Sequence, residues 1–313
     1  RHARNRLQPS FAFDHRFGDN FFLGLSLANA GGASAALFGS AGAGTVVDNP
    51  ISSEMTHLRP ALLPGLLQAA ARNQARGFGD MALFEVGPAF HGGEPGEQHL
   101  LATGLLVGAV AARDPHGSRR NADVFDAKAD AEAVLAALGA PARVQIGRGV
   151  QVWWHPGRSG AMKLGPVTLA VFGEVHPKVL AAMDVKGPAV GFTIFVEDVP
   201  LPKTRSIARP ALALPDLQAV ERDFAFVVDA QVEALALVNA AQGADKALIA
   251  RVSVFDEFAG PKAEAQMGPA KKSLAITVRL QPVERTLTEA DIEGVSARIV
   301  EKVGKATGGV LRG

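Results

Sequence analysis

A proline-rich segment divides this chain of 313 residues into two parts. Residues 200–218, PLPKTRSIARPALALPDLQ, hold four prolines and no regular apolar spacing, which is typical of an extended linker. Hydrophobic residues make up 48% of the chain, which is enough for two separate cores. We therefore expect a first domain over residues 1–205, a linker over 206–218 and a second domain over 219–313.

The first part combines strand patterns with two helix patterns. Leu62, Leu66 and Asn73 recur at helical spacing, and residues 126–138 form a second apolar stripe that ends in Gly-Ala-Pro. Strands are expected at 81–90, 100–110, 168–177 and 190–199. The segment 153–166 is rich in turn formers and is expected to contain a turn. Because strands and helices do not alternate regularly, the pattern favours an α+β domain with a mainly antiparallel sheet.

The second part has a simpler order of elements. Strands are expected at 222–229, 247–258, 272–281 and 308–312, with one helix at 232–241. Thr288 and Asp291 have the spacing of a helix capping box, and the apolar stripe that follows predicts a second helix. The order β-α-β-β-α-β is that of a ferredoxin-like domain.

Side-chain alternation predicts on which face of the sheet each residue of the second and third expected strands lies. In KSLAITVRL, Leu274, Ile276 and Val278 share one face, so Ser273 points away from the core. In RVSVFDEF, Asp256 has the same parity as the inward-facing valines. Asp256 can therefore meet a ligand only if the strand ends or bulges at that point.

Charge and composition exclude several classes of function. The chain has 32 Lys and Arg against 31 Asp and Glu, so no global basic field attracts polyanions. The absence of cysteine excludes disulfides, Cys-ligated zinc and thiol nucleophiles. The longest apolar run, 100–112, is too short for a membrane span. The first residues, RHARNRLQPS, have neither a start methionine nor an apolar signal core, so we expect a fragment.

No complete catalytic constellation is present in the sequence. No two of the eight histidines stand four residues apart, and no HExxH motif occurs, so we expect no metal site. Ser159 in HPGRSGA lacks the final glycine of a nucleophile elbow. An enzyme that uses His155 with Glu85 or Glu174 as an acid–base pair remains the alternative hypothesis, and Arg158 with His155 could also face a partner or a phosphate.

A series of motifs resembles one family when taken in order. The series is NPISSEMTHLRPALLPGLLQAAARN, LFEVGPAF, FDAKADAEAVLAALG, HPGRSG, FGEVHP, RDFAFVVD, VFDEF, KKSLAITVRLQ and RTLTEADI. It is similar to the C-terminal portion of bacterial phenylalanyl-tRNA synthetase β subunits over residues 35–313. This resemblance implies an antiparallel class II synthetase-like core, catalytically silent, followed by a ferredoxin-fold anticodon-binding domain. Neither an FRxE-type nor a GxGxGxER motif occurs, which agrees with a silent core.

The family resemblance also implies partners and cofactors. The first domain would pack on the catalytic α subunit of an α2β2 ligase in the cytoplasm, and the second would bind the phenylalanine-specific tRNA. Phenylalanine and ATP would bind the α subunit and Mg²⁺ is implied for the holoenzyme, so no cofactor or catalytic residue is expected in this fragment. No membrane and no DNA are expected as partners.

Three residues of the second domain are implied as anticodon contacts. The carboxylate of Asp256 can accept hydrogen bonds from the N1–H and N2–H edge of guanine, the first base of the phenylalanine anticodon. Ser273 would contact the same base, and Phe258 would supply a stacking face where the family commonly has tyrosine. From the residues alone, an ion pair of Asp256 with Lys271 or Lys272 is the competing interpretation.

The remaining candidates lie at loop edges and around the first helix. Lys271, Lys272 and Arg285 could contact tRNA phosphates or could be solvated charges. Asn49, Pro50, Arg59, Pro60 and Pro64 are candidates for the interface with the α subunit, although each could serve only in capping and turns. A purely structural assembly module that never touches RNA is a third hypothesis.

Overall fold

The computed structural model describes residues 29–30, 37–39, 43–50, 56–110, 115, 117–141, 143–201 and 214–312. The chain divides into two compact units, Arg1–Arg205 and Ser206–Gly313. Most of the segment expected to be a linker, up to residue 213, lies outside the described residues. None of the described helices is long and apolar enough to cross a membrane.

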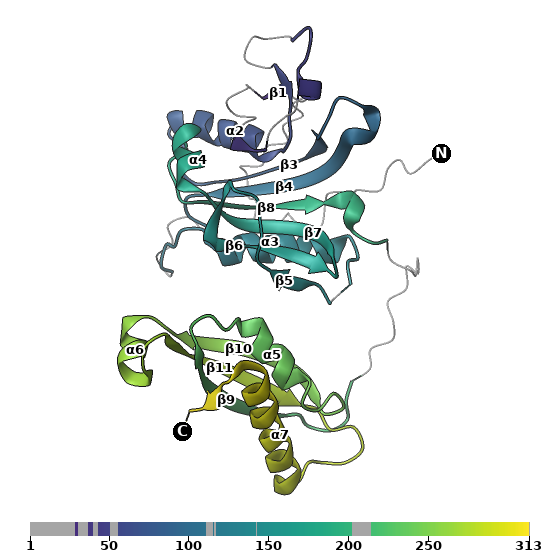
Figure 1. The fold of residues 1–313 in the computed structure, drawn as a ribbon, viewed down its shortest axis with the longest axis vertical. Coiled ribbons are helices and arrows are strands. Elements are labelled where there is room, and N and C mark those ends of the chain that lie inside the picture. Colours follow the sequence, from purple (N-terminus) through teal and green to yellow (C-terminus); the bar gives the residue numbers. More distant parts are fainter. Residues whose placement is uncertain are drawn as a thin grey trace. The chain divides into compact units, whose positions relative to one another are not determined.

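The first unit is built on a six-stranded antiparallel sheet in the order β3-β4-β8-β7-β6-β5 (Figure 1). Its strands are β3 (Met81–Phe90), β4 (Gln98–Val107), β5 (Gln145–Gly147), β6 (Trp154–Leu164), β7 (Val167–Val175) and β8 (Ala189–Phe195). The short strands β1 (Asn29–Ala30) and β2 (His57–Leu58) form a separate pair. The helices are α2 (Leu63–Ala75), α3 (Val124–Ala137) and α4 (Pro177–Ala182), with 3₁₀ turns at Ala43–Thr45, Pro95–Glu97 and Val196–Asp198.

Helices cover both faces of this sheet and form two cores. Leu63, Leu66 and Leu67 of α2 and Leu180 of α4 pack on one face, against residues such as Leu105. Ala127, Ala131 and Leu135 of α3 pack on the other face, against Phe192 and Ile194. The predicted helices and the antiparallel α+β sheet are thus confirmed in this unit.

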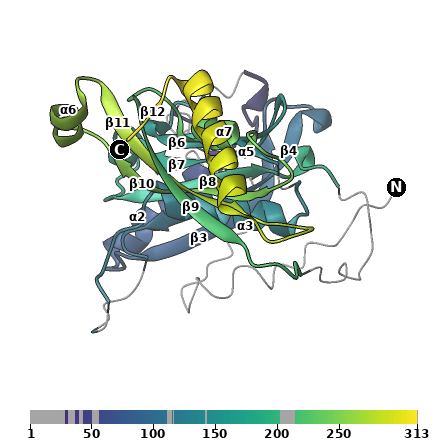
Figure 2. The same cartoon turned by 90° about the horizontal axis from the view of Figure 1, so that it is seen from below.

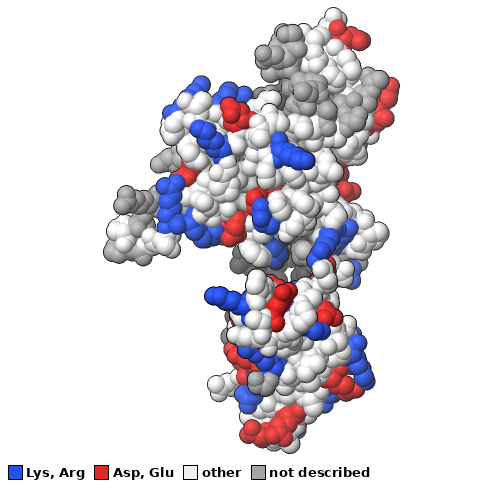
Figure 3. Space-filling model, turned by 60° about the vertical axis from the view of Figure 1, so that its left-hand side comes forward, with Lys and Arg blue, Asp and Glu red and all other residues white. Residues whose placement is uncertain are grey.

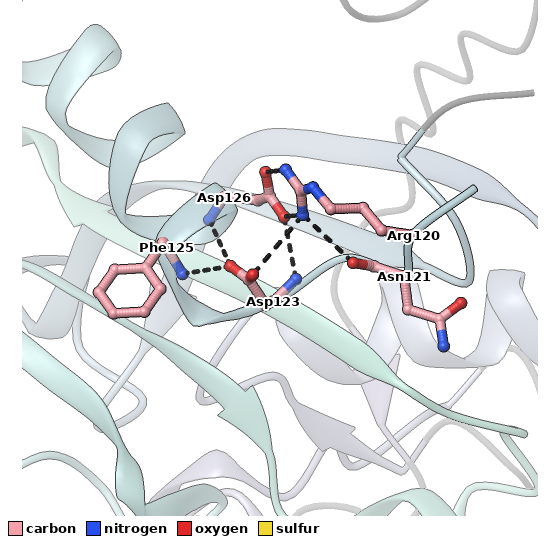
Figure 4. A network of polar contacts seen from close by, with 5 residues as sticks. All are labelled: Arg120, Asn121, Asp123, Phe125 and Asp126. Carbon is pink, nitrogen blue, oxygen red and sulfur yellow. Dashed lines mark hydrogen bonds and ion pairs between the residues drawn. The ribbon is translucent and has the colours of Figure 1, made fainter. Parts of the chain in front are cut away.

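Helix α3 begins at a polar network that fixes its first turn (Figure 4). The Asp123 side chain accepts from the backbone N–H groups of Phe125 and Asp126, and the Asp126 side chain accepts from the Asp123 N–H at 2.9 Å. Arg120 donates two hydrogen bonds to the Asp126 carboxylate, at 2.6 and 2.7 Å. This reciprocal cap satisfies N–H groups that a helix start would otherwise leave unpaired.

The turn expected within 153–166 lies at residues 165–166, between β6 and β7, whereas the part of the segment that holds Pro156 and Gly157 belongs to strand β6. Trp154 pairs with Val175 and Ser159 with Gly173, so residues 155–158 of β6 face only Glu174 of β7. Pro156 and Gly157 lie in this wide bulge, where a missing ladder hydrogen bond is tolerated. The turn-forming residues therefore interrupt the strand without ending it.

The second unit is a four-stranded antiparallel sheet in the order β10-β11-β9-β12, with helices on one face (Figures 1 and 2). Its elements are β9 (Val220–Asp229), α5 (Ala234–Gln242), β10 (Ile249–Phe258), α6 (Pro261–Met267), β11 (Lys271–Leu280), α7 (Glu289–Thr307) and β12 (Val310–Leu311). The predicted ferredoxin-like order is confirmed. One addition is α6, a short helix between the expected strands 247–258 and 272–281.

The core of the second unit follows the predicted alternation. Leu274, Ile276 and Val278 of β11 are buried against Leu237 of α5 and Ile299 of α7. The Thr288 side chain caps α7 by accepting from the Asp291 N–H, and the Asp291 side chain accepts from the Thr288 N–H. The predicted capping box is therefore confirmed. The opposite face of the sheet, called here the outer face, therefore carries Ser273, Ala275 and their cross-strand neighbours.

Candidate nucleic-acid interface

A β-bulge at Phe255 moves Asp256 to the outer face. Val254 pairs with Ile276, whereas Asp256 pairs with Ala275, so Phe255 is an extra residue in β10. Because directly opposite residues share a face, Val254 lies on the helix side and Asp256 on the outer side. The bulge that the sequence required for this contact is therefore present at this point.

Phe258, Ser273 and Val227 form a row across the outer face. Phe258 pairs with Ser273, which pairs in turn with Val227 of β9, and Val227 pairs with Val310 of β12. Phe258 is half-buried, whereas the side chain of Val310 is exposed. Ser273 points away from the helices as predicted, but it is only 4% exposed. A ligand on this face would therefore find Phe258 more accessible than Ser273.

The lysines next to Asp256 are occupied by other carboxylates. Lys271 binds Asp229 at 2.5 Å, and Lys272 binds Glu257 at 3.1 Å. Asp256 itself is exposed and has no hydrogen bond or ion pair with any residue that the structure describes. The competing interpretation, in which Asp256 is paired with Lys271 or Lys272, is therefore wrong.

Arg285 lies away from this group. It follows β11, whereas Ser273 is near the start of that strand, and about 20 Å of extended chain separates the two ends. Arg285 donates two hydrogen bonds to Asp291, at 2.7 and 2.9 Å, and these contacts raise its pKa. The structure thus does not bring Arg285 to the other candidates but places it at the start of α7.

Alternation alone could have found two further residues on this face. In RDFAFVVD, Phe224 and Phe226 are core residues, so Ala225 and Val227 must point outward. Ala225 pairs with Ala275, so two small side chains lie next to Asp256 along one row. No sequence signal marked Phe255 as a bulge residue, and its ring is 58% exposed.

Two of the interface candidates in the first unit are internal residues. Arg59 is 8% exposed and donates from Nη1 to Glu85 Oε1 at 2.5 Å and from Nε to the Pro88 carbonyl at 2.9 Å. Pro64 is buried in the first turn of α2. Neither side chain offers a surface to a partner, which corrects that part of the prediction. Asn49 is exposed, and Pro50 and Pro60 are half-buried.

The acid–base residues of the alternative enzyme hypothesis are not gathered in one place. Glu85 lies on β3 and Glu174 on β7, three strands away in the sheet, which is about 14 Å. Glu85 is engaged by Arg59, and Glu174 by Arg158. The described residues hold no group of three or more His, Asp or Glu side chains that could bind a metal ion.

The fold and the outer-face cluster define an α+β chain whose second unit is a ferredoxin-fold module with α5 and α7 packed on one face of its sheet. Residues 33–196 match the family model described as phenylalanyl tRNA synthetase beta chain CLM domain. Residues 215–312 match the ferredoxin-fold anticodon binding domain. The chain belongs to the family of phenylalanyl-tRNA synthetase beta chains, which confirms the resemblance predicted from its motifs.

Two relatives agree with this assignment. The chain is 75% identical over 281 residues to the phenylalanine–tRNA ligase beta subunit of Cereibacter sphaeroides, and 68% identical over 282 residues to that of Ruegeria pomeroyi. Each match covers 90% of this chain and 35% of the relative, so the chain spans about a third of their length. A pyrrolysyl-tRNA synthetase structure from Desulfitobacterium hafniense is similar at 16% identity and a TM-score of 0.43, over 57% of this chain and 59% of the other.

Proposed function

We propose that the second unit recognises the anticodon of a phenylalanine-specific tRNA, as part of a β subunit of phenylalanine–tRNA ligase. The observation that carries the proposal is the carboxylate of Asp256, which is exposed, has no partner among the described residues and lies on the same open face as Phe258. A free carboxylate beside a half-buried aromatic ring suits a base that stacks on the ring and presents N–H donors at its edge.

Guanine is the base that fits this chemistry best. Its Watson–Crick edge carries two donors, N1–H and N2–H, which a carboxylate can accept together. Adenine, cytosine and uracil do not present this pair of adjacent donors. Ser273 lies directly opposite Phe258 on this face, although only 4% of it is exposed. We propose Asp256 as the specificity contact, with Phe258 for stacking and Ser273 as an additional hydrogen-bond partner.

Long-range charge contributes little to this interface. Residues 219–313 contain 12 Lys and Arg and 13 Asp and Glu. Both signs are interspersed on the molecular face of Figure 3. Lys271 and Lys272, at the start of β11, already bind Asp229 and Glu257. Specificity would therefore come from stacking and directed hydrogen bonds, while other modules of the ligase supply phosphate attraction.

For the first unit we propose a structural role next to the catalytic α subunit of an α2β2 ligase in the cytoplasm. Asn49 is exposed and Pro50 and Pro60 are half-buried, and the buried Arg59–Glu85 pair holds the residue directly before Pro60. ATP, Mg²⁺ and phenylalanine would act at the α subunit, because this chain carries neither of the class II motifs that hold ATP. The chain itself would contribute assembly and tRNA recognition.

The experiment is aminoacylation by the full ligase carrying Asp256→Asn. We expect the transition-state stabilisation measured by kcat/KM to fall by about 1–3 kcal/mol with the native transcript, since hydrogen bonds from a base edge to a charged acceptor are lost. A transcript in which adenine replaces the first anticodon guanine should respond much less to the substitution. Glu293→Gln, which changes an exposed acid on α7, is the matched control. Equal kcat/KM for parent and Asp256→Asn at several salt concentrations would favour the purely structural module.

A further inference from the structure

Two histidines of the first unit lie against each other at one end of β6. The ring centroids of His155 and His176 are 6.3 Å apart, and the ring planes differ by 26°. His155 is in the bulge of β6, and His176 directly follows β7. Both residues are half-buried.

The bulge that positions His155 depends on a close approach to β7. A Cβ atom at Gly173 would lie 2.5 Å from the Ser159 Cβ and 3.0 Å from the Arg158 carbonyl oxygen. The Ser159 hydroxyl donates to the His155 carbonyl at 2.6 Å, which closes the bulge on itself. The geometry around His155 is therefore fixed by backbone contacts and does not depend on the histidine rings alone.

Hydrogen bonds define which ring nitrogen of each histidine is available. The backbone N–H of Gly157 donates to His155 Nδ1, and that of Lys178 donates to His176 Nδ1, each at 3.1 Å. Because a backbone N–H can only donate, both Nδ1 atoms are acceptors, and the neutral rings carry their proton on Nε2. Neither Nε2 has a hydrogen-bond partner in the part of the chain that the structure describes. The pair thus presents two free N–H donors.

The charges around the pair are positive on balance. Arg158 forms a two-point contact with Glu174, including Nη2 to Oε1 at 2.9 Å, so the two charges compensate each other. Lys178 is exposed and has no carboxylate partner among the described residues. An oxyanion beside the histidines would therefore meet donors and a cation, while the nearest acid is already occupied.

The adjoining edge of the sheet extends this positive character. Between Glu132 and Glu174 the chain has no Asp or Glu, whereas it has Arg143, Arg148, Arg158 and Lys163. Gln145 of the edge strand β5 pairs with Lys163 of β6, and a hollow of about 400 Å³ lined by Arg143, Gln145, Leu164 and Gly165 lies next to them. Because of the bulge, the strand from His155 to Lys163 spans only the length of Glu174 to Thr168 on β7, about 20 Å, which is the length of several nucleotides and far more than one carboxylate needs.

We propose that His155 and His176, with the basic edge of β5 and β6, bind the phosphate backbone of an RNA strand. The Nε2–H groups donate to one phosphodiester oxygen pair, and Arg143 and Lys163 attract phosphates further along the strand. This proposal rests on the proposed function only in that tRNA is the RNA partner. The proposed contact lies on the first unit, and it does not recognise the anticodon base.

The test is tRNA binding by the full ligase with His155→Asn and His176→Asn together. Asparagine Oδ1 replaces Nδ1 as the acceptor for the backbone N–H groups, so the bulge and the start of α4 are preserved while the Nε2 donors are lost. We expect affinity to fall roughly tenfold, because hydrogen bonds to a charged acceptor are the stronger class. The fall should be the same for the native transcript and for one with a replaced anticodon base. His99→Asn, a half-exposed histidine on β4, is the control.

A second pair of variants tests the basic edge. Arg143→Gln with Lys163→Gln should reduce the slope of log affinity against log salt by roughly 0.7 for each phosphate contact to a single strand. Unchanged affinity and slope in all these variants would overturn the proposal. Weaker assembly with the α subunit, at unchanged tRNA affinity of the assembled ligase, would also overturn it and identify a protein-binding surface. Of the variants at Asp256 and at the basic edge, only Asp256→Asn should change the discrimination between the native transcript and the transcript with a replaced anticodon base. Each of the two proposals can therefore fail without the other.

Discussion

Asp256 lies directly opposite Ala275 on the outer face of the second-unit sheet, and Ala275 lies opposite Ala225. Because alanine side chains are short, this row leaves room above the sheet next to the row of Phe258, Ser273 and Val227. A planar base can lie over the alanine row, with its face toward the Phe258 ring and its edge toward the carboxylate. The position of Asp256 relative to small neighbours is therefore as important as its charge.

Replacing the ring should separate stacking from hydrogen bonding. Phe258→Ala is expected to weaken tRNA binding by the full ligase by about 1–3 kcal/mol, the usual contribution of one stacked base. Phe258→Tyr should keep the affinity, because the ring remains. Phe255→Ala, which removes the 58% exposed ring in the bulge, is the matched control and should have little effect in a filter-binding titration. Equal losses from Phe255→Ala and Phe258→Ala would mean that Phe258 is not the stacking residue.

Much of the fold was predictable because each element carries a regular apolar period. Leu274, Ile276 and Val278 alternate along a strand, and the Thr288–Asp291 cap marks the start of α7, so both elements were identified with nearly the right bounds. The side chains that these periods assign to the core are buried. Alternation predicts faces well wherever the ladder is regular.

The errors lie where backbone irregularity overrides local pattern. Val254 and Phe255 are ordinary strand residues, so nothing in the sequence marks the bulge that moves Asp256 to the outer face. Pro156 and Gly157 suggest a turn, but neighbouring strands keep their segment extended. The sequence predicts Arg59 as an interface candidate because it does not reveal that Glu85, 26 positions later, lies beside it. Such contacts depend on tertiary packing, which periodicity cannot report.

Replacing only one partner of the buried Arg59–Glu85 pair should destabilise the protein much more than replacing both. Their side chains are 9% and 8% exposed, so Arg59→Met leaves a buried carboxylate without its partner. We expect a loss of about 3–5 kcal/mol in the free energy of unfolding, measured by urea denaturation. The double variant with Glu85→Leu should recover most of that loss. Arg119→Met, which removes the exposed contact with Asp80, should change stability by less than about 1 kcal/mol. A similar effect from both arginines would contradict the assigned burial.

Replacing Gly173 should destabilise the bulge of β6, whereas replacing Gly157 should not. Gly173→Ala would place a Cβ 2.5 Å from the Ser159 Cβ, so we expect a destabilisation of about 1–3 kcal/mol. A Cβ at Gly157 would meet only the His155 ring, at 3.7 Å, which is an ordinary contact. Gly157→Ala should therefore be neutral or stabilising by up to about 1 kcal/mol. Thermal unfolding of the two variants checks the difference, and equal melting temperatures would contradict the close approach of β6 to β7.

The Arg285–Asp291 contact predicts an acid-dependent stability of the second unit. The hydrogen bond from Arg285, followed by those from the side chain and backbone of Thr288, holds the pKa of Asp291 well below its ordinary value of 3.8. A carboxyl whose pKa is lower in the folded state stabilises that state fully above its unfolded pKa, and this contribution is lost as pH falls through the lowered folded value. We therefore expect Asp291→Asn to reduce the melting temperature at pH 7, with a difference from the parent that narrows as pH falls below about 3.8. Glu289→Gln, an exposed acid in the same helical turn, serves as the control. A difference between Asp291→Asn and the parent that stays constant from pH 7 to pH 2 would show that the ion pair does not contribute.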